Sequence, residues 1–461
     1  MSTETSSELT NGDTAESADM ALPPLIEARA GRAPRAVSAT LPNGLDTLVV
    51  RRPTVPMVEV RLRIPLPAAN SATAAATTAR GSLMSASMLF GTAQRNQERL
   101  ANDLAAVGAD LSVSADADRL LFSTAVLRTG LSTVLGLLAE VVTSASYPSA
   151  EVSAERDRLG QRIAMALTQP AVVARMARCR RLFGDHPYAQ TMPDLSVVAG
   201  LEAATLRRTH RDRVRPYGAT LVVVGDVQPA TVVRQATSAF ADWVGPARKS
   251  RMMPLPDFDP VGITLVDRPG AVQSNVRIGG GAVGRRDPVY AALQLANLIF
   301  GGYFSSRLTE NLRERNGFTY SPHSGIDNSA AGSTILIDAD VASAVTARAV
   351  HETWYELGRM ALAPVTQDEL DSARRYALGT LALSTATQAG LASTLTSLAG
   401  QGLSASWLTG YQKAVAGVTI ADVQAVSHRY LSVSSLATVV VGDAALVENS
   451  LGSLAAVRKP G

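Results

Sequence analysis

Cysteine is almost absent from this chain of 461 residues, in which Cys179 is the only one. A single cysteine excludes an internal disulfide framework, which fits a reducing compartment. No uninterrupted apolar run reaches the roughly 18–20 residues that a membrane-spanning helix needs. The start of the chain also lacks a basic segment followed by an apolar one, the pattern of a secretory signal. We therefore expect a cytoplasmic protein that makes no contact with a membrane.

Histidine is also scarce, and the five that are present are too far apart in sequence for two of them to share a helix face. His186 lies in a Pro-containing loop, where we expect a structural role. His323 follows Pro322, and a surface loop is favoured over a position in a substrate cleft. Ser305 and Ser306 have no matching histidine nearby, so a serine nucleophile has little support. These absences predict that the chain itself binds no metal ion.

A strong net charge is missing as well, because the formal net charge is only +3. Two arginine-rich stretches stand out, ARCRR near Arg180 and LRRTHRDRVR around Arg211. Neither contains interleaved aromatic residues on which bases could stack, so we interpret both as solvated helix faces. Nucleic-acid binding is therefore not expected.

The chain is long enough for more than one domain, and its composition changes along its length. Residues 1–35 are polar, acidic and free of aromatics, which predicts a disordered tail. Between 58 and 64, apolar residues alternate with charged ones, which predicts a strand with one buried face. Residues 246–260 carry four prolines, which favour extended chain. We therefore expect a linker at 246–260 between two larger parts, 36–245 and 261–461.

The two larger parts repeat each other. The sequence VVVGD occurs at 222–226 and again at 439–443, and Leu89-Phe90-Gly91 recurs as Ile299-Phe300-Gly301 at nearly the same spacing. Two independent landmarks with similar spacing indicate two homologous halves. Each half begins with strands, continues through long helices and ends on a valine-rich strand. This order predicts an α+β fold in which each half is a mostly antiparallel sheet covered by helices.

The segment FGGYFSSRLTENLRERNGFTYS carries the clearest chemistry. A helix with Leu308 and Leu312 on its apolar face is expected to stop at Asn316-Gly317, and Tyr320 is expected early on the strand that follows. Arg313 on the helix offers a fork of donors to a carbonyl or carboxylate and stays charged at any working pH. The hydroxyl of Tyr320 could donate to a developing oxyanion.

These sequences resemble a known family. GGYFSSRL, LRERNGFTY, GDHPYAQ, VVVGD and MLFGT are similar to the pitrilysin-type zinc peptidases, the family of mitochondrial processing peptidase, over about residues 36–450. The resemblance implies that the two halves face each other around a chamber. In this family His-x-x-Glu-His precedes MLFGT, and its two histidines lie on one helix face and bind zinc.

The zinc-binding residues of the family are missing here. Residues 83–87, directly before MLFGT, read Leu, Met, Ser, Ala and Ser. Arg162 stands where the resemblance places a third ligand, a glutamate, and a guanidinium repels a cation. Glu155 is kept nearby, and we interpret it as an exposed helix residue.

The resemblance also implies a division of labour. Some bacterial members of the family are heterodimers, in which one subunit holds the zinc and the other lacks it but supplies an arginine and a tyrosine. This chain resembles the second kind, with Arg313 and Tyr320 as catalytic residues and no cofactor of its own. The expected substrate-binding residues are Gly301, Gly302, Phe304 and Ser305. The expected partners are a homologous zinc-bearing subunit and a peptide substrate.

Two other interpretations remain open. The chain could be a catalytically inert structural or binding homologue, like the core subunits of respiratory complexes, in which the Arg/Tyr pair is an inherited packing feature. It could also be a self-sufficient hydrolase with an unrecognised site. A His-x-x-Glu-His homologue encoded beside this chain would favour the heterodimeric peptidase.

Overall fold

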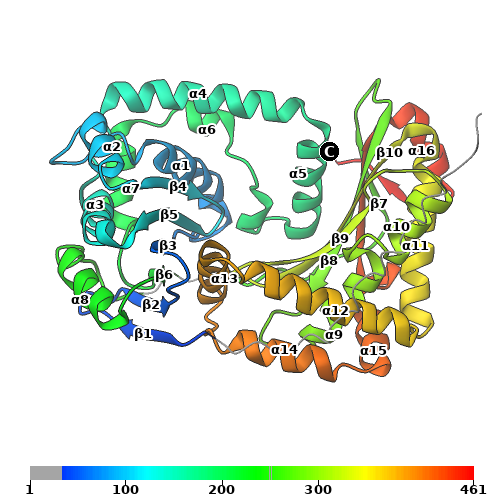
Figure 1. The fold of residues 1–461 in the computed structure, drawn as a ribbon. Coiled ribbons are helices and arrows are strands. Elements are labelled where there is room, and N and C mark those ends of the chain that lie inside the picture. Colours follow the sequence, from blue (N-terminus) through cyan, green and yellow to red (C-terminus); the bar gives the residue numbers. More distant parts are fainter. Residues whose placement is uncertain (1–33, 249, 251, 461) are drawn as a thin grey trace, which may run out of the picture.

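The computed structural model describes residues 34–248, 250 and 252–460. Of the acidic tail expected at 1–35, all but the last two positions lie outside these residues. Two sheets, one from each half of the chain, face each other across the molecule, and helices pack around both (Figure 1).

The N-terminal sheet contains β1 (Ala36–Thr40), β2 (Asp46–Arg51), β3 (Met57–Pro65), β4 (Asp110–Ala115), β5 (Arg119–Leu127) and β6 (Thr220–Gly225). Their order across the sheet is β1-β2-β6-β3-β5-β4. Neighbouring strands are antiparallel except for β2 and β6, which are parallel.

The C-terminal sheet contains β7 (Ile263–Asp267), β8 (Gln273–Ala282), β9 (His323–Asn328), β10 (Ser333–Ala342), β11 (Ala437–Gly442) and β12 (Val457–Arg458). Their order is β12-β7-β11-β8-β10-β9. Here β7 is parallel to both β11 and β12, and the other neighbours are antiparallel.

Helices make up most of the remaining chain. Those of the N-terminal half are α1 (Ala74–Ser87), α2 (Gln97–Ala105), α3 (Leu131–Ser144), α4 (Ser149–Thr168), α5 (Pro170–Phe183), α6 (Leu195–Ala199), α7 (Ala203–Arg213) and α8 (Pro229–Ala239). Those of the C-terminal half are α9 (Tyr290–Asn297), α10 (Arg307–Thr309), α11 (Thr346–Leu362), α12 (Gln367–Ser384), α13 (Gln388–Gly400), α14 (Trp407–Gly417), α15 (Ile420–Tyr430) and α16 (Ala444–Gly452), together with two π-helical turns, η4 (Leu298–Gly302) and η5 (Glu310–Arg315). Within the described residues, no helix combines the length and the apolar character that crossing a membrane requires.

The two sheets have equivalent strand orders. The first VVVGD sequence forms β6 between β2 and β3, and the second forms β11 between β7 and β8. The outer strand next to β2 comes from the start of the chain, whereas the one next to β7 comes from its end. The predicted α+β fold of two homologous halves, each with a mostly antiparallel sheet, is therefore confirmed.

One helix of the C-terminal half packs on the sheet of the N-terminal half. On α13, Leu391 and Leu395 are buried together with Val222 and Val224 of β6. This explains why β6 is buried on both faces and why its sequence contains a continuous run of valines. In Figure 1, α13 lies beside the N-terminal sheet, far in sequence from the strands that it covers.

The reciprocal contact is made by α5, which packs on the C-terminal sheet. Leu182 of α5 lies against Leu336 and Ala437. Gly279 of β8 permits this approach, because a Cβ atom there would lie 2.9 Å from the Leu182 Cδ1 atom. Residues 246–260, the expected linker, form no helix or strand where they are described, and Phe258 packs edge-on against Phe183 of α5.

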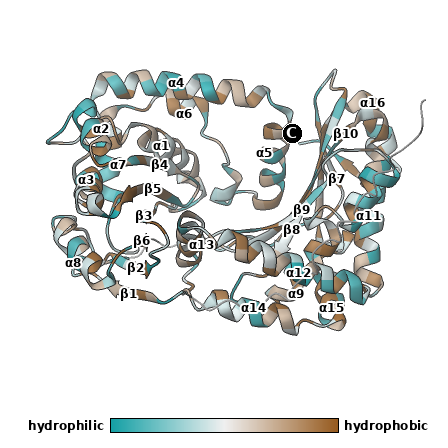
Figure 2. Ribbon diagram, in the orientation of Figure 1, coloured by the Kyte–Doolittle hydropathy of each residue, from teal (hydrophilic) through white to brown (hydrophobic). Residues whose placement is uncertain are grey.

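The exchange of helices also corrects one expectation about β3. Its apolar residues Val58, Val60, Leu62 and Ile64 are fully buried, and Figure 2 shows β3 and β5 as hydrophobic strands. The opposite face is not simply solvated, however, because Arg63 is also buried. A Cβ atom at Gly400 of α13 would lie 2.7 Å from the Arg63 Nε atom, so the C-terminal half covers this arginine. The expectation of a single buried face was therefore wrong.

A buried histidine makes stability depend on pH. His210 of α7 lies between the Tyr147 hydroxyl, 2.9 Å from Nδ1, and the Val142 carbonyl oxygen, 2.8 Å from Nε2. Burial lowers the pKa of His210 to about 4, whereas an exposed histidine has a pKa of about 6.5. As pH falls from about 6.5 to 4, the His210 imidazole therefore binds a proton in the unfolded chain but stays neutral in the folded chain. We expect this residue to remove about 2 kcal/mol of stability by pH 5 and about 3 kcal/mol by pH 4.

The measurement is urea unfolding of wild type and His210→Gln between pH 8 and pH 5. The variant loses some stability at every pH, but the difference between the two proteins should shrink as pH falls. His351→Gln, at an exposed position on α11, serves as the control for the loss of an imidazole side chain. Parallel curves for wild type and His210→Gln would show that the imidazole does not titrate in this way.

Candidate functional site

The helix that should carry the metal ligands carries an apolar face instead. Residues 83–87 form the C-terminal end of α1. Leu83 and Ser87 stand at the two histidine positions, and both are 0 % exposed. The Ser87 hydroxyl has no hydrogen-bond partner among the described residues. Leu83 has no donor atom for a metal, so these two side chains do not fit a zinc site.

The position of the third ligand is also incompatible with a cation. The Arg162 Nη2 atom donates to the Glu155 carboxylate at 2.6 Å, and the Arg158 Nε atom donates at 2.8 Å. Burial raises the pKa of Glu155, but the hydrogen bonds from the two arginines outweigh it and hold the pKa below its ordinary value. Glu155 is buried, so the expectation of an exposed glutamate was wrong.

No group of three or more His, Cys, Asp or Glu side chains that could hold a metal occurs within residues 34–248, 250 and 252–460. His186 is buried, and its ring accepts from the Tyr188 backbone N–H at 3.1 Å. His323 is exposed at the start of β9. The histidines of the chain are therefore not gathered at one site.

The Arg/Tyr segment folds as a short helix followed by a loop. Ser306 caps the helix with its side chain, and the helix runs through α10 into the wider turn η5. It stops at Gly317, which has a φ of +62°, as the sequence predicted. Tyr320, however, lies in the loop, and β9 begins only at His323. The prediction that Tyr320 lies on a strand was wrong, because the chain needs this loop to return from the helix to the sheet edge.

Arg313 lies between two exposed aromatic rings. Its guanidinium carbon is 4.6 Å from the ring centroid of Tyr320 and 4.8 Å from that of Phe304. The Tyr320 and Phe304 residues are 78 % and 65 % exposed, and the Arg313 side chain is 29 % exposed. We call Phe304, Arg313 and Tyr320 the aromatic–arginine cluster. Cation–π contacts hold the guanidinium against the two rings. The Arg313 Nε atom also lies 3.2 Å from the carboxylate of the exposed Glu314, so one side of the guanidinium is paired at the surface.

The cluster stands on a rigid support. The Arg307 guanidinium donates to both oxygens of Glu369 on α12, at 2.6 and 2.9 Å. Asn311 donates to the buried Glu356 of α11 at 2.9 Å. These contacts tie the helix of the cluster to two long helices, so the position of Arg313 does not depend on the loop alone.

The other expected substrate-binding residues fall into two groups. Gly301 is buried and packs closely, because a Cβ atom there would lie 2.8 Å from the Cβ atom of Ser324. Gly302 packs in the same way against Leu298. Ser305 is exposed next to Phe304. The structure therefore brings Phe304 together with Arg313 and Tyr320 and places Ser305 beside them, while the two glycines serve the close packing of η4.

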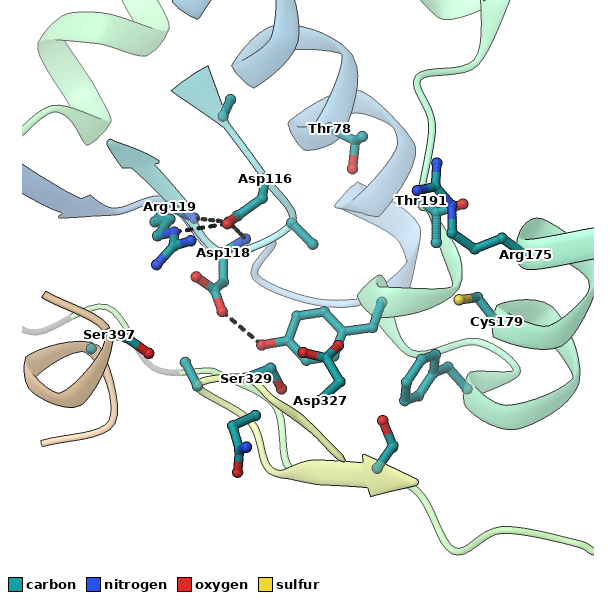
Figure 3. A pocket seen from close by; sticks show the side chains of 18 of the residues that line it. Thr78, Asp116, Asp118, Arg119, Arg175, Cys179, Thr191, Asp327, Ser329 and Ser397 are labelled. Carbon is teal, nitrogen blue, oxygen red and sulfur yellow. Dashed lines mark hydrogen bonds and ion pairs between the residues drawn. The ribbon is translucent and has the colours of Figure 1, made fainter. Parts of the chain in front are cut away.

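A second feature, a cavity of about 480 Å³, lies where the two halves meet (Figure 3). Its walls include Asp118 on the N-terminal side and Asp327 and Ser329 on the C-terminal side, with Cys179 of α5 at its edge. Burial raises the pKa of the Cys179 thiol, so this cysteine is not an activated nucleophile.

Asp118 is the centre of a bridge between the halves. It accepts a hydrogen bond from the Arg63 Nη2 atom at 3.1 Å and another from the Tyr188 hydroxyl at 2.7 Å. The Tyr188 oxygen in turn accepts from the backbone N–H of Ala331, on the hairpin between β9 and β10, at 3.3 Å. Sequence reasoning missed this network, because its members lie far apart in the chain and none belongs to a periodic pattern.

Fold and site together define a peptidase-like protein of two homologous halves, in which the metal position holds no ligands and a half-buried arginine lies against an exposed tyrosine. The sequence profile of "Insulinase (Peptidase family M16)" matches residues 82–193, and that of "Peptidase M16 inactive domain" matches residues 200–376. The chain belongs to peptidase family M16, the pitrilysin-type peptidases, which confirms the resemblance found in the sequence.

Curated relatives agree with this assignment, and solved structures share the fold. An uncharacterized zinc protease of Mycobacterium leprae is 28 % identical over 313 residues, which cover 65 % of this chain and 68 % of the relative. One from Streptomyces coelicolor is 25 % identical over 304 residues, covering 62 % and 63 %. The structure of a peptidase M16 inactive domain from Pseudomonas fluorescens has a TM-score of 0.81 at 24 % identity, covering 89 % of this chain and 98 % of that one. A protease from Helicobacter pylori gives 0.80 at 18 % identity, covering 89 % and 100 %, and these two structures share the fold.

Proposed function

We propose that this chain is the non-metal-binding subunit of a heterodimeric zinc metallopeptidase, and that Arg313 and Tyr320 act on a peptide bound at the zinc site of a homologous partner subunit. The observation that carries the proposal is a contrast within the chain. The metal position on α1 is buried and lacks ligands, whereas the aromatic–arginine cluster is exposed and firmly supported.

Each residue of the pair has a distinct task in amide hydrolysis. The reaction passes through a tetrahedral intermediate with a developing oxyanion, and the Tyr320 hydroxyl donates to that oxygen more strongly than to the ground-state carbonyl. Arg313 keeps its charge at any working pH and binds a substrate carbonyl or carboxylate. Its contacts with both rings orient Tyr320 and Phe304, so the three side chains act as one surface.

The residue types of the aromatic–arginine cluster support the idea that another molecule binds over it. Aromatic residues and arginine are enriched in the buried centres of protein interfaces and carry much of their binding energy. Phe304 and Tyr320 are both largely exposed in the single chain. Burial of these rings against a peptide and a partner subunit would remove apolar surface from water.

The second candidate is a structural or binding homologue without catalytic activity. The contact of Arg313 with two rings favours a structural role, because these contacts alone would stabilise the loop before β9. In that case the cluster would pack against a partner without acting on a peptide.

The test is peptide hydrolysis by this chain alone, by a zinc-bearing homologue alone, and by their mixture, with bound zinc quantified in each sample. We expect activity only in the mixture, with all of the zinc in the homologue. Assembly without a gain in activity would favour the structural homologue. Zinc-dependent cleavage by this chain alone would overturn the proposal, since its own residues would then hold the metal.

A further inference from the structure

The arginine-rich stretch around Arg211 does not form a simple solvated face. It makes up the C-terminal part of α7, which packs beside α1 (Figure 1). Between the two helices, near the end of β3, lies a pocket of about 230 Å³. Its lining includes three arginines and two threonines, namely Arg80, Arg208, Arg213, Thr77 and Thr209. The expectation that the whole stretch is solvated was therefore wrong, since Arg213 is half-buried.

The positive charges around this pocket are poorly balanced. Asp212 is the one carboxylate in its lining, and it lies 3.8 Å from the exposed Arg211. Arg80, Arg208 and Arg213 form no ion pair within 4 Å with any residue in the described part of the chain. Burial, followed by the charges of Arg215 and Arg80, lowers the pKa of Arg213. Like charges are thus held close together, with Asp212 as the single carboxylate in the lining.

Unused donors point to the same conclusion. The Nε atom of Arg80, which lines the pocket, is buried and has no hydrogen-bond partner among the described residues. Arg213 uses one Nη atom to donate to the Pro67 carbonyl oxygen, which fixes its guanidinium in place. Buried donors are nearly always paired in proteins, with other groups, water or ligands. The pocket therefore contains arginine N–H donors that lack an acceptor, and a negatively charged ligand would supply one.

We infer that the pocket between α1 and α7 binds a small multiply charged oxyanion of the phosphate type. Arginine forks match phosphate oxygens and form charge-assisted hydrogen bonds with them. The volume suits phosphate or diphosphate and excludes a peptide or a folded nucleic-acid segment. The lining also contains no aromatic ring on which a base could stack.

The location gives this site a structural consequence. Arg80 lies on α1, three residues before Leu83, so the two are neighbours along the helix. An oxyanion shared by Arg80, Arg208 and Arg213 would link α1 to α7. The helix that holds a cation in zinc-bearing members of the family would here be held by an anion. This site is independent of the proposed peptidase role, since it needs neither partner nor peptide.

The experiment is calorimetric titration of the isolated full chain with inorganic diphosphate, inorganic phosphate and acetate, in a phosphate-free buffer at constant salt. The variants are Arg208→Ala and Arg80→Met, and the control is Arg211→Ala, which removes an exposed arginine of the same helix outside the pocket. We expect saturable binding of diphosphate, weaker binding of phosphate and none of acetate. Each pocket variant should lose about ten- to hundredfold in diphosphate affinity, and the control should bind as wild type does.

Thermal unfolding provides the second measurement. Diphosphate should raise the Tm of wild type and of Arg211→Ala but not that of Arg80→Met, because only the folded pocket binds the anion. Arg208 is exposed, so Arg208→Ala should fold normally and keeps the test informative if Arg80→Met does not. Absence of saturable binding to wild type would overturn the inference. Equal affinity of wild type and both pocket variants would also overturn it, since the anion would then bind elsewhere.

Discussion

Replacing Tyr320 by phenylalanine should lower the turnover of the assembled peptidase by about 10²–10³, the usual effect of removing one donor to an oxyanion. Tyr320→Phe keeps the ring and its contact with Arg313, so assembly with the partner and the stability of this chain should not change. The loss should appear in kcat, because the hydroxyl acts on the transition state more than on the bound substrate. Steady-state peptide hydrolysis by the reconstituted complex measures it directly.

A matched control separates this effect from a general loss of surface hydroxyls. Tyr355 of α11 is also exposed, at 53 %, and lies beside an arginine, Arg359. Tyr355→Phe should therefore leave both assembly and turnover at the wild-type level. A complex with Tyr320→Phe that cleaves at the wild-type rate would show that Tyr320 has no catalytic role, and the structural homologue would become the better interpretation.

Removing the carboxylate of Asp118 should destabilise the folded chain by about 3–5 kcal/mol, because the buried Arg63 would lose its partner. The Asp118 and Arg63 side chains are 11 % and 8 % exposed, so water cannot replace the lost interaction fully. The Tyr188 hydroxyl loses its acceptor in the same variant. Urea unfolding of wild type and Asp118→Ala measures the difference in free energy of unfolding.

The control for this prediction is an ion pair on the surface. Asp157 pairs with Arg156 on α4 and is 64 % exposed. Asp157→Ala should cost less than about 1 kcal/mol, the usual value for an exposed pair. Asp118→Asn should fall between the two variants, since an amide oxygen still accepts a hydrogen bond but carries no charge. Equal stability of Asp118→Ala and Asp157→Ala would mean that the halves are not held together through Asp118.

Prediction from sequence worked where the signal is local. The stop of the helix at Gly317 follows from one residue that tolerates positive φ, and the structure shows it there. The strand expected at Tyr320 failed because a short run of four residues contains too little pattern to separate strand from loop. The sequence placed Arg313 on a helix and Tyr320 shortly after it, but the stacking of Arg313 with Phe304 depends on a turn, η4, that no periodicity indicates.

The sequence by itself determined the two-half α+β fold and the absence of metal ligands before MLFGT. Repeated segments report homology, and an absent side chain needs no structure to be recognised. Only the tertiary structure decided that α5 and α13 are exchanged between the halves, that Arg63 meets Asp118, and that Arg80 joins the arginines of α7. The physical reason is that these contacts join residues far apart in the chain. Burial of apolar side chains and pairing of charges stabilise these contacts where separate elements pack together. Such contacts produce no periodic pattern in the sequence of either element.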